Sequence, residues 1–259
     1  MMNNVANFKH PEFLVSVDWL LENLEDPNLR IYDCTAHLIP HPTETYTIGS
    51  GKGDYEKAHI PGADFLDLQQ ELSNNTSKLR FTFPSAEHFS KAIGAHGLSN
   101  DNQAILYSTT SPQWATRIWW MLRAFGFDNA KVLDGGLIRW VQKGYPTSTI
   151  PSTYPEQSFT AKPRPGLIIQ KSEVLEGIHE SNTCIINALS QEQHIGVGGR
   201  TYGRPGRIKD SENIPTTELI DPKTNEFYPA AVIAERFASV GTQSSDRVLT
   251  YCGGGIAAS

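Results

Sequence analysis

The chain has 259 residues, of which 39% are hydrophobic and 19% charged, and its formal net charge is −6 at pH 7. This length suits one large domain or two ordinary ones, and an acidic balance argues against a broad nucleic-acid-binding face. No stretch approaches the roughly 18 consecutive apolar residues of a membrane helix. The opening residues MMNNVANFKHPEFLVS lack the charged and then apolar architecture of a secretion signal. We therefore expect a cytoplasmic protein that binds neither nucleic acid nor membranes.

The first half, residues 1–146, alternates short apolar strands with helices. Its first elements are predicted as a helix in VDWLLENL (17–24) with Ser16 as N-cap, a strand at 29–34, a polar stretch ending in HIPGA (59–63), and a helix within 85–97. A second strand at 103–108, an amphipathic helix at 113–126, a strand at 130–136 and a helix at 137–144 come next. This alternation is typical of a parallel sheet covered by helices on both faces.

Prolines are most frequent between residues 146 and 165, in PTSTIPSTYPEQSFTAKPRP, where hydrophobic periodicity is almost absent. Such a composition is typical of a surface linker. We therefore predict a first domain at 1–146, a linker at 147–165 and a second domain at 166–259.

The second half repeats the order of the first. Its predicted elements are a helix in EVLEGIHE with Ser172 before it, a strand at 183–188, a polar stretch ending at 206–215, a helix within 229–241 and a strand at 247–252. The matching positions are Ile31 with Ile185, Asp33 with Asn187, His59 with Arg207, and Ser108 with Cys252. This correspondence indicates a tandem duplication.

The two halves differ in length beyond their second strand. The first half continues with a helix, a strand and a helix, whereas only seven residues come after Cys252 in the second. A parallel sheet that lacks a strand exposes an edge and part of an apolar face. We therefore expect the second domain to be incomplete at its C-terminus.

Three cysteines, Cys34, Cys184 and Cys252, lie far apart in the chain. Their odd number excludes a simple disulfide framework, and no CxxC or HxxxH spacing indicates a metal site. Cys34 and Cys184 fall in or at the end of predicted strands, so we interpret them as structural residues. Cys252 differs because three glycines come directly after it.

The segment YCGGGIAAS (251–259) places Cys252 where a strand ends. Glycine adopts positive φ easily, so the amides of Gly253, Gly254 and Gly255 can turn inward and form an anion-binding nest. Such a nest favours the thiolate form of the cysteine and can hold a persulfide. The alternative is a cysteine packed as a small hydrophobe beside an ordinary turn.

The motifs HIPGA (59–63) and VLDGGLIRW (132–140), in this order of elements, resemble those of the rhodanese-type sulfurtransferases. The two-domain class of that family contains thiosulfate and 3-mercaptopyruvate sulfurtransferases. The resemblance covers about residues 12–259 and implies an α/β protein of two tandem rhodanese-like domains. It implies a catalytically inactive first domain, where Ser108 replaces the cysteine, and a second domain whose Cys252 carries the sulfur.

The resemblance also implies the chemistry. An anionic donor, thiosulfate or 3-mercaptopyruvate, passes a sulfane sulfur to Cys252 as a persulfide, and cyanide or a thiol accepts it, without metal or organic cofactor. Several positions depart from the family pattern, which leaves the donor open. No basic residue lies after Cys252, Gly254 and Ala257 stand where mercaptopyruvate enzymes carry hydroxyl residues, and Arg207 replaces a histidine. A Cdc25-type phosphatase is disfavoured, because Ala258 stands where it needs an arginine.

Arginines that could hold the donor are concentrated in GVGGRTYGRPGR (196–207). Guanidinium groups bind carboxylate and thiosulfate oxygens in a fork geometry, and the resemblance implies that this loop serves the donor. We expect Arg204 and Arg207, and then Arg200, to bind it together with the loop residues Gly253, Gly254, Gly255, Ile256 and Ala257. The alternative is a solvated basic loop.

Two functions of other classes stay open. A degenerate member of the family would bind sulfur species or a partner protein without turnover. A redox sensor would use the thiolate of Cys252 to form a sulfenic acid with peroxide.

Overall fold

The computed structural model describes residues 7–41, 46–198, 203–242 and 247–259. The first half contains a five-stranded parallel sheet in the order β1-β7-β6-β2-β5. Its strands are β1 (Leu14–Val15), β2 (Leu29–Asp33), β5 (Asp64–Phe65), β6 (Gln103–Tyr107) and β7 (Ala130–Leu133). Its helices are α1 (Val17–Glu22), α2 (Lys52–Lys57), α3 (Ala86–Ala95), α4 (Gln113–Ala124) and α5 (Gly136–Gln142).

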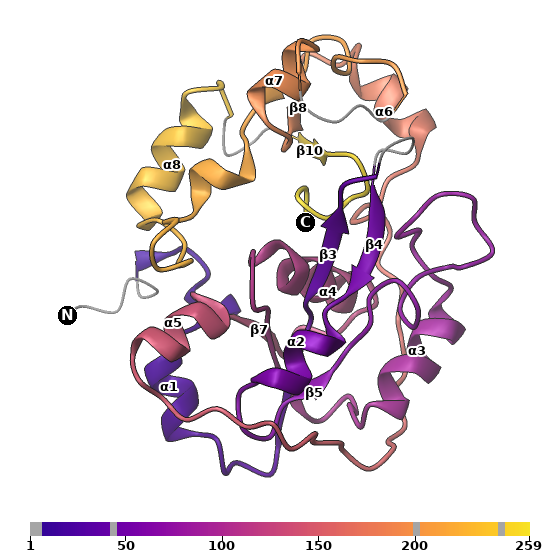
Figure 1. The fold of residues 1–259 in the computed structure, drawn as a ribbon. Coiled ribbons are helices and arrows are strands. Elements are labelled where there is room, and N and C mark those ends of the chain that lie inside the picture. Colours follow the sequence, from indigo (N-terminus) through magenta and orange to yellow (C-terminus); the bar gives the residue numbers. More distant parts are fainter. Residues whose placement is uncertain (1–6, 42–45, 199–202, 243–246) are drawn as a thin grey trace.

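The second half contains a three-stranded parallel sheet in the order β10-β8-β9. Its elements are α6 (Lys171–Gly177), β8 (Thr183–Asn187), α7 (Gln191–Ile195), β9 (Glu212–Asn213), α8 (Ala230–Ala238) and β10 (Arg247–Tyr251). In Figure 1 this half lies above the first, and the segment after β10 descends toward α4 and a hairpin of β3 (Ala36–Ile39) and β4 (Thr47–Ser50). The last residues of the chain therefore lie between the two sheets.

The two sheets share their hydrogen-bond pattern, which confirms the duplication. Asp33 pairs in register with Tyr107, as Asn187 does with Tyr251. The N–H of Ile60 donates to the Tyr107 hydroxyl at 3.2 Å. The N–H of Ile208 donates to the Tyr251 hydroxyl at 3.0 Å in the same way. Ser108 and Cys252 each come directly after one of these tyrosines, so they occupy equivalent positions.

Both faces of the first sheet are covered by helices. One face packs Ile31 against α1 and α5, where Leu20 and Trp140 are fully buried. The other packs Tyr32 and Leu106 in a cluster with residues of α3 and α4. The alternation of Ile31 and Tyr32 between these clusters is a consequence of the two-residue period of a strand. The predicted fold class is confirmed.

The segment at 147–165 is mostly exposed but also packs against the first half. Residues 151–165 form neither helix nor strand, but they pack against the first half. Phe159 is 6% exposed and belongs to the core cluster. The Tyr154 hydroxyl accepts from the N–H of Ile31 at 2.9 Å and donates to the carbonyl of Gly62 at 2.7 Å. Proline fixes an extended backbone here without preventing its side chains from packing.

Some local predictions need correction. Ser16 caps α1 as predicted and accepts from the N–H of Trp19 at 3.2 Å. Ser172, in contrast, lies inside α6, whose N-cap is Gln170. The N–H of Gln170 donates to the Glu173 carboxylate at 2.8 Å as half of a capping box. The sequence reasoning also did not anticipate the β3–β4 hairpin and the five-residue helix α7.

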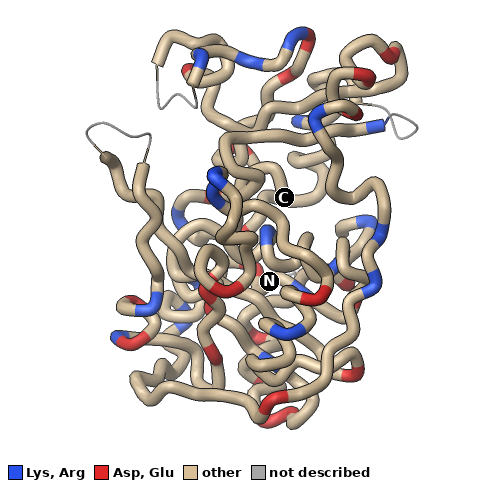
Figure 2. The backbone as a smooth tube through the Cα atoms, turned by 90° about the vertical axis from the view of Figure 1, so that its right-hand side faces the viewer, with Lys and Arg blue, Asp and Glu red and all other residues tan. Residues whose placement is uncertain are grey.

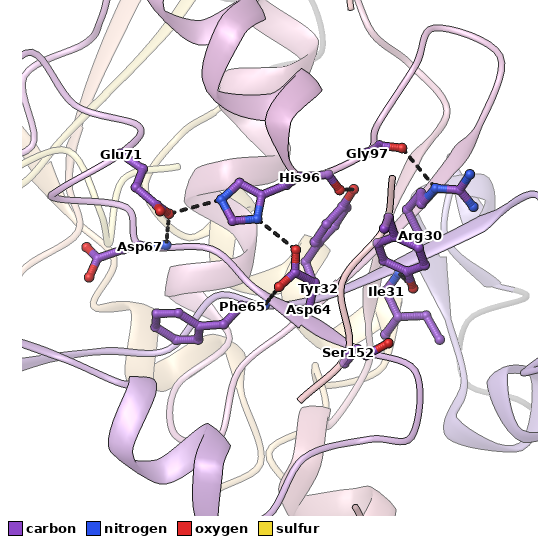
Figure 3. Close-up of polar contacts among 12 residues, drawn as sticks. Arg30, Ile31, Tyr32, Asp64, Phe65, Asp67, Glu71, His96, Gly97 and Ser152 are labelled. Atoms are coloured by element: carbon purple, nitrogen blue, oxygen red, sulfur yellow. Dashed lines mark hydrogen bonds and ion pairs between the residues drawn. The ribbon is translucent and has the colours of Figure 1, made fainter. Parts of the chain in front are cut away.

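A partly buried polar cluster fixes the end of α3 in the first half (Figure 3). His96 contacts Asp64 Oδ2 through Nδ1 at 2.7 Å and Glu71 Oε2 through Nε2 at 3.2 Å. Its carbonyl accepts from the Tyr32 hydroxyl at 2.9 Å. Burial alone would lower the pKa of His96, but the two carboxylates outweigh it and raise the pKa to about 9. The cluster therefore ties β5 and its adjoining loop to α3.

Charged side chains are interspersed by sign along both halves (Figure 2). Within the described ranges, no helix is both long and apolar enough to cross a membrane. The same residues contain no group of three or more His, Cys, Asp or Glu side chains arranged for a metal ion.

Candidate active site

Cys252 is half-buried at the carboxyl end of β10, the edge where parallel sheets place their sites. The backbone N–H of Gly255 donates to its sulfur at 3.1 Å. Gly255 has a φ of +74°, and this left-handed conformation is what turns its amide inward. The sequence predicts that the backbone amides at 253–257 form a nest. Among them, the amide of Gly255 is the one that hydrogen-bonds to the sulfur.

The loop is tightly enclosed by residues of the first half. A Cβ on Gly255 would lie 3.2 Å from Arg117 Nη1, and one on Gly254 would lie 3.2 Å from Phe81 Cδ2. These gaps are narrower than an ordinary van der Waals contact, so larger residues would require Phe81 or Arg117 to move. The glycines therefore give the first half close access to the backbone beside Cys252.

Arg117 of α4 forms the most direct link between the halves. Its Nη1 donates to the carbonyl of Gly255 at 3.2 Å, and its Nη2 donates to the carbonyl of Phe81 at 3.1 Å. The side chain is buried, with an exposed fraction of 6% for the residue. Burial lowers the pKa of Arg117 to about 10, while an anionic Cys252 raises it.

Cys252 lies on the wall of a cavity of about 360 Å³ between the two halves. The first half contributes Leu38, Tyr46, Phe81 and Gln113. The second half contributes the cysteine loop and the neighbouring hydroxyl residues Ser190, Thr216 and Thr217. The predicted inactive domain thus supplies part of the wall around the Cys252 sulfur.

A smaller cavity of about 110 Å³ lies within the second half and also reaches Cys252. Arg204 lines it together with Gln193 and Tyr251. Arg207 is exposed and is not among the described residues that line this cavity. Burial is the main factor that lowers the pKa of His194 in α7, and the positive charge of Arg207 is the second. Arg200 lies outside the described residues.

The last two residues of the predicted loop, Ile256 and Ala257, contact different parts of the protein. Ile256 is 5% exposed and packs its side chain into the core cluster of the first half. Ala257 lines the larger cavity with Gly253 and Gly254. The hydroxyl of Thr250 donates to the carbonyl of Ala258 at 2.7 Å, which holds the returning chain against β10. Ile256 therefore anchors the loop.

The equivalent position in the first half is closed. Ser108 is 1% exposed, and its hydroxyl donates to the carbonyl of Ser111 at 2.6 Å. Burial raises the pKa of the neighbouring Asp33 to about 6, although its Oδ1 accepts from the N–H of Thr35 at 2.9 Å. Asn187 takes the place of Asp33 in the second half, where its Oδ1 accepts from the N–H of Leu189 at 3.0 Å. The second half therefore lacks the carboxylate but keeps the hydrogen bond from a backbone N–H two residues along the chain.

The other two cysteines lie away from these cavities. Cys34 is fully buried, and this burial raises its pKa well above the usual value. Cys184 is half-buried, with its sulfur 3.7 Å from Thr242 Oγ1. Of the three, Cys252 is the one that lines a described cavity.

Sequence reasoning missed the residues that the first half brings to the site, above all Arg117. One signal was present. Trp114, Ile118 and Met121 form the buried stripe of α4, and Arg117 lies three residues after Trp114 on the same stripe. A charged residue at such a position is rarely buried without a partner, so it indicates a contact with a distant part of the chain.

Comparison with known proteins identifies the family. The rhodanese-like domain family matches residues 16–143. Thiosulfate/3-mercaptopyruvate sulfurtransferase 2 of Arabidopsis thaliana is 30% identical over 98% of this chain and 79% of its own length. The 3-mercaptopyruvate sulfurtransferase of Escherichia coli K12 is 30% identical over 95% of this chain and 85% of its own length.

A solved structure agrees with these relatives. The crystal structure of SseA, a 3-mercaptopyruvate sulfotransferase from Escherichia coli, superposes with a TM-score of 0.79 at 29% identity, covering 95% of this chain and 90% of that chain. The Arabidopsis relative covers 98% of the chain, so its alignment extends over both halves and includes Cys252. The chain therefore belongs to the rhodanese-type family of thiosulfate and 3-mercaptopyruvate sulfurtransferases.

Proposed function

We propose that the protein transfers a sulfane sulfur from an anionic donor to a thiophilic acceptor through a persulfide on Cys252. The observation that carries this proposal is the N–H of Gly255, which donates to the Cys252 sulfur at 3.1 Å at the edge of two cavities. A backbone N–H donor stabilises an anionic thiolate or persulfide, and it does not ionise near neutral pH. Free cysteine is a weak nucleophile until its thiolate is stabilised in this way.

With thiosulfate, the Cys252 thiolate attacks the outer sulfur. A new S–S bond forms, the S–S bond of the donor breaks, and sulfite leaves with the electron pair. With 3-mercaptopyruvate, the donor C–S bond breaks instead, and the thiol proton ends on the methyl group of pyruvate. In both cases cyanide or a thiolate then attacks the outer persulfide sulfur and releases the Cys252 thiolate, so no external oxidant or reductant is needed.

The two cavities suit the two half-reactions of such a cycle. Arg204 lines the smaller one and can attract the carboxylate or sulfonate end of a donor. The larger one, between the halves, offers hydroxyl groups of Ser190, Thr216 and Thr217 to an acceptor. We assign Arg207 to long-range attraction of the anion, because it is exposed and lies in the same loop as Arg204. Both cavities reach Cys252, so we assign the backbone of Gly253 to Ala257 to holding the transferred sulfur on this residue.

We propose domain boundaries at 1–146 and 166–259, with the packed segment 147–165 between them. Two parallel sheets, one within 14–133 and one within 183–251, support this division. The three cysteines are unpaired, which supports a reducing, cytoplasmic setting.

A redox sensor is the second candidate, because the same half-buried sulfur would serve it. The structure offers no resolving cysteine for Cys252 among the described residues, since Cys34 is fully buried and Cys184 lies beside Thr242. This arrangement favours sulfur transfer over a disulfide-forming sensor.

Steady-state kinetics test the proposal. Thiocyanate formation from cyanide is measured with thiosulfate and with 3-mercaptopyruvate, each over a grid of both substrates. Sulfur transfer through Cys252 predicts ping-pong patterns and loss of all turnover in Cys252→Ser, whereas Cys184→Ser keeps wild-type rates. Turnover that survives in Cys252→Ser would reject the proposal. Peroxide-driven sulfenic acid formation with no thiocyanate from either donor would favour the sensor.

A further inference from the structure

The guanidinium of Arg117 is a buried cation for which the described part of the chain supplies no carboxylate. The residue is 6% exposed, and its Nε atom is buried without a hydrogen-bond partner. Its other nitrogens face neutral acceptors, which are the carbonyls of Gly255 and Phe81 and the Ser259 hydroxyl at 3.5 Å. Among the described residues, Cys252 is the one ionisable group that acts on its pKa.

A buried charge without an opposite charge is strongly unfavourable, because carbonyl dipoles replace only part of its hydration. Five other described arginines pair with a carboxylate. Arg123 of the same helix pairs with Asp128 at 3.3 Å, and Arg139 of α5 pairs with Glu226 at 3.2 Å. Arg117 is therefore stabilised most when an anion forms beside it.

The cysteine loop needs a cation from elsewhere. Residues 253–259, GGGIAAS, contain no basic side chain. Arg117 contacts this loop through the carbonyl of Gly255, while the N–H of the same residue donates to the Cys252 sulfur. Gly255 thus connects the guanidinium to the sulfur, and its lack of a Cβ permits the approach, since a Cβ would lie 3.2 Å from Nη1.

We propose that Arg117, from the catalytically inactive half, is a positioning residue that supplies the counter-charge for the anionic sulfur of Cys252 and fixes Gly255 so that its amide faces that sulfur. This role rests on the proposed function, in which Cys252 is a thiolate and then a persulfide. The first half thereby contributes the charge that the loop of the second half lacks.

The test measures the thiolate of Cys252 directly, without a sulfur donor. Alkylation of Cys252 is monitored by peptide mass spectrometry from pH 5 to 10 with neutral iodoacetamide and with anionic iodoacetate. Arg117→Gln removes the charge but keeps an N–H donor for one of the carbonyls. Arg117→Lys restores a charge, and Arg123→Gln on the same helix is the matched control.

We expect Arg117→Gln to raise the alkylation midpoint by about one pH unit, a tenfold loss of thiolate at lower pH. It should also lower the rate with iodoacetate relative to iodoacetamide severalfold, because the local positive potential is lost. Arg117→Lys should recover most of both effects, and Arg123→Gln should show neither. An unchanged midpoint and an unchanged reagent ratio in folded Arg117→Gln would overturn the inference.

A second comparison leaves Arg117 in place, so it does not depend on the folding of that variant. Cys252→Asp and Cys252→Asn differ by one charge at the position of the sulfur. An uncompensated cation beside this position predicts that Cys252→Asp melts at a higher temperature than Cys252→Asn at pH 7. Equal melting temperatures, or a more stable asparagine variant, would contradict the inference.

The two proposals fail in different ways. If neither donor loads sulfur on Cys252 but Arg117→Gln still shifts the alkylation midpoint, the sulfur-transfer proposal is wrong and the electrostatic role stands. If sulfur loads normally but the midpoint does not move in Arg117→Gln, the role of Arg117 is wrong and sulfur transfer stands.

Discussion

The backbone N–H of Phe227, in the second half, donates to Asp134 Oδ1 of the first half at 2.8 Å. Asp134 lies directly after β7 and is 4% exposed. An ion pair between Arg139 and Glu226 at 3.2 Å reinforces the same junction. Burial raises the pKa of Asp134 to about 7, with the N–H of Phe227 acting against it and Glu226 adding to it. A carboxyl group that titrates near neutral pH thus lies at the contact between the halves.

This relationship predicts a pH-dependent stability. The folded-state pKa of about 7 lies above the unfolded value of roughly 3.9, so the folded protein holds a proton that the unfolded chain releases. The contribution of Asp134 to stability therefore falls as the pH rises from 4 to 7. Asp134→Asn keeps an oxygen acceptor for Phe227 and cannot ionise. Its unfolding free energy relative to wild type should rise by about 1–3 kcal/mol from pH 5 to pH 8.

Urea denaturation of both proteins at pH 5 and pH 8 measures this difference. The test compares how the difference in unfolding free energy between the two proteins changes with pH. Asp33, whose pKa burial raises to about 6, contributes a pH dependence of the same sign to both proteins. A wild-type and an Asp134→Asn protein that keep the same stability difference at both pH values would show that this carboxyl is ionised throughout.

The His96 cluster predicts a loss of stability with rising pH as well, but in a higher pH range. The folded pKa of about 9 exceeds the unfolded value of roughly 6.5, so the stabilisation is complete below pH 6.5 and disappears as the pH rises through 9. His96→Gln should lose about 1–2 kcal/mol at pH 6, after allowance for the partly exposed Glu71, and little at pH 10.

Denaturation at pH 6 and pH 10 checks this expectation. A loss of equal size at both pH values in His96→Gln would indicate that packing, rather than the charge between Asp64 and Glu71, stabilises the end of α3.

Much of the fold could be predicted because its elements carry local signals. The strands at 29–34, 103–108, 183–188 and 247–252 are confirmed as β2, β6, β8 and β10, each within one residue. Continuous apolar runs of this length, alternating with amphipathic helices, are typical of parallel sheets. The position of Cys252 after β10 could also be predicted from strand and turn patterns alone.

The contacts between the halves could not be predicted in this way. Arg117 and Gly255 are separated by 138 residues, and neither lies in a motif that indicates the other. Phe159 reaches the first core from a proline-rich segment without periodicity, so composition indicated a surface linker. Such contacts depend on how complete sheets pack together, and short-range patterns do not encode that packing.

The donor cavity predicts a selective effect of Arg204. Arg204→Gln should raise the KM for thiosulfate or 3-mercaptopyruvate about 10-fold with a smaller change in kcat, because a charge-assisted contact contributes about 1.5 kcal/mol. Arg247→Gln is the control, since Arg247 lies 3.6 Å from both Glu173 and Glu180 and lines no cavity among the described residues. Donor titrations at fixed cyanide measure both. A KM unchanged in Arg204→Gln would place donor recognition elsewhere.

Because Phe81 encloses the loop, we expect a hydroxyl residue at position 254 to destabilise the protein. A Cβ there would lie 3.2 Å from Phe81 Cδ2 and 3.5 Å from the Tyr46 hydroxyl. Gly254→Ser should destabilise the protein by about 1 kcal/mol, since an overfilled site forces its neighbours to shift. Combination with Phe81→Leu should recover part of this loss as a coupling energy of about 0.5 kcal/mol or more.

Thermal and urea unfolding of the two single variants and the double variant give this coupling. Gly53→Ser in α2 is the control, because no atom lies within 4 Å of a Cβ built there. Strict additivity of Gly254→Ser and Phe81→Leu would mean that the two residues do not share the space beside Cys252.

Intact-mass spectrometry after a single exposure to donor tests the central claim most directly. Wild type, Cys252→Ser and Cys184→Ser are incubated with thiosulfate or with 3-mercaptopyruvate, weighed, and weighed again after cyanide. Sulfur transfer through Cys252 predicts a gain of about 32 Da in wild type and Cys184→Ser that cyanide removes, and no gain in Cys252→Ser. A folded wild-type protein that gains no sulfur from either donor, or a gain that persists in Cys252→Ser, would contradict it.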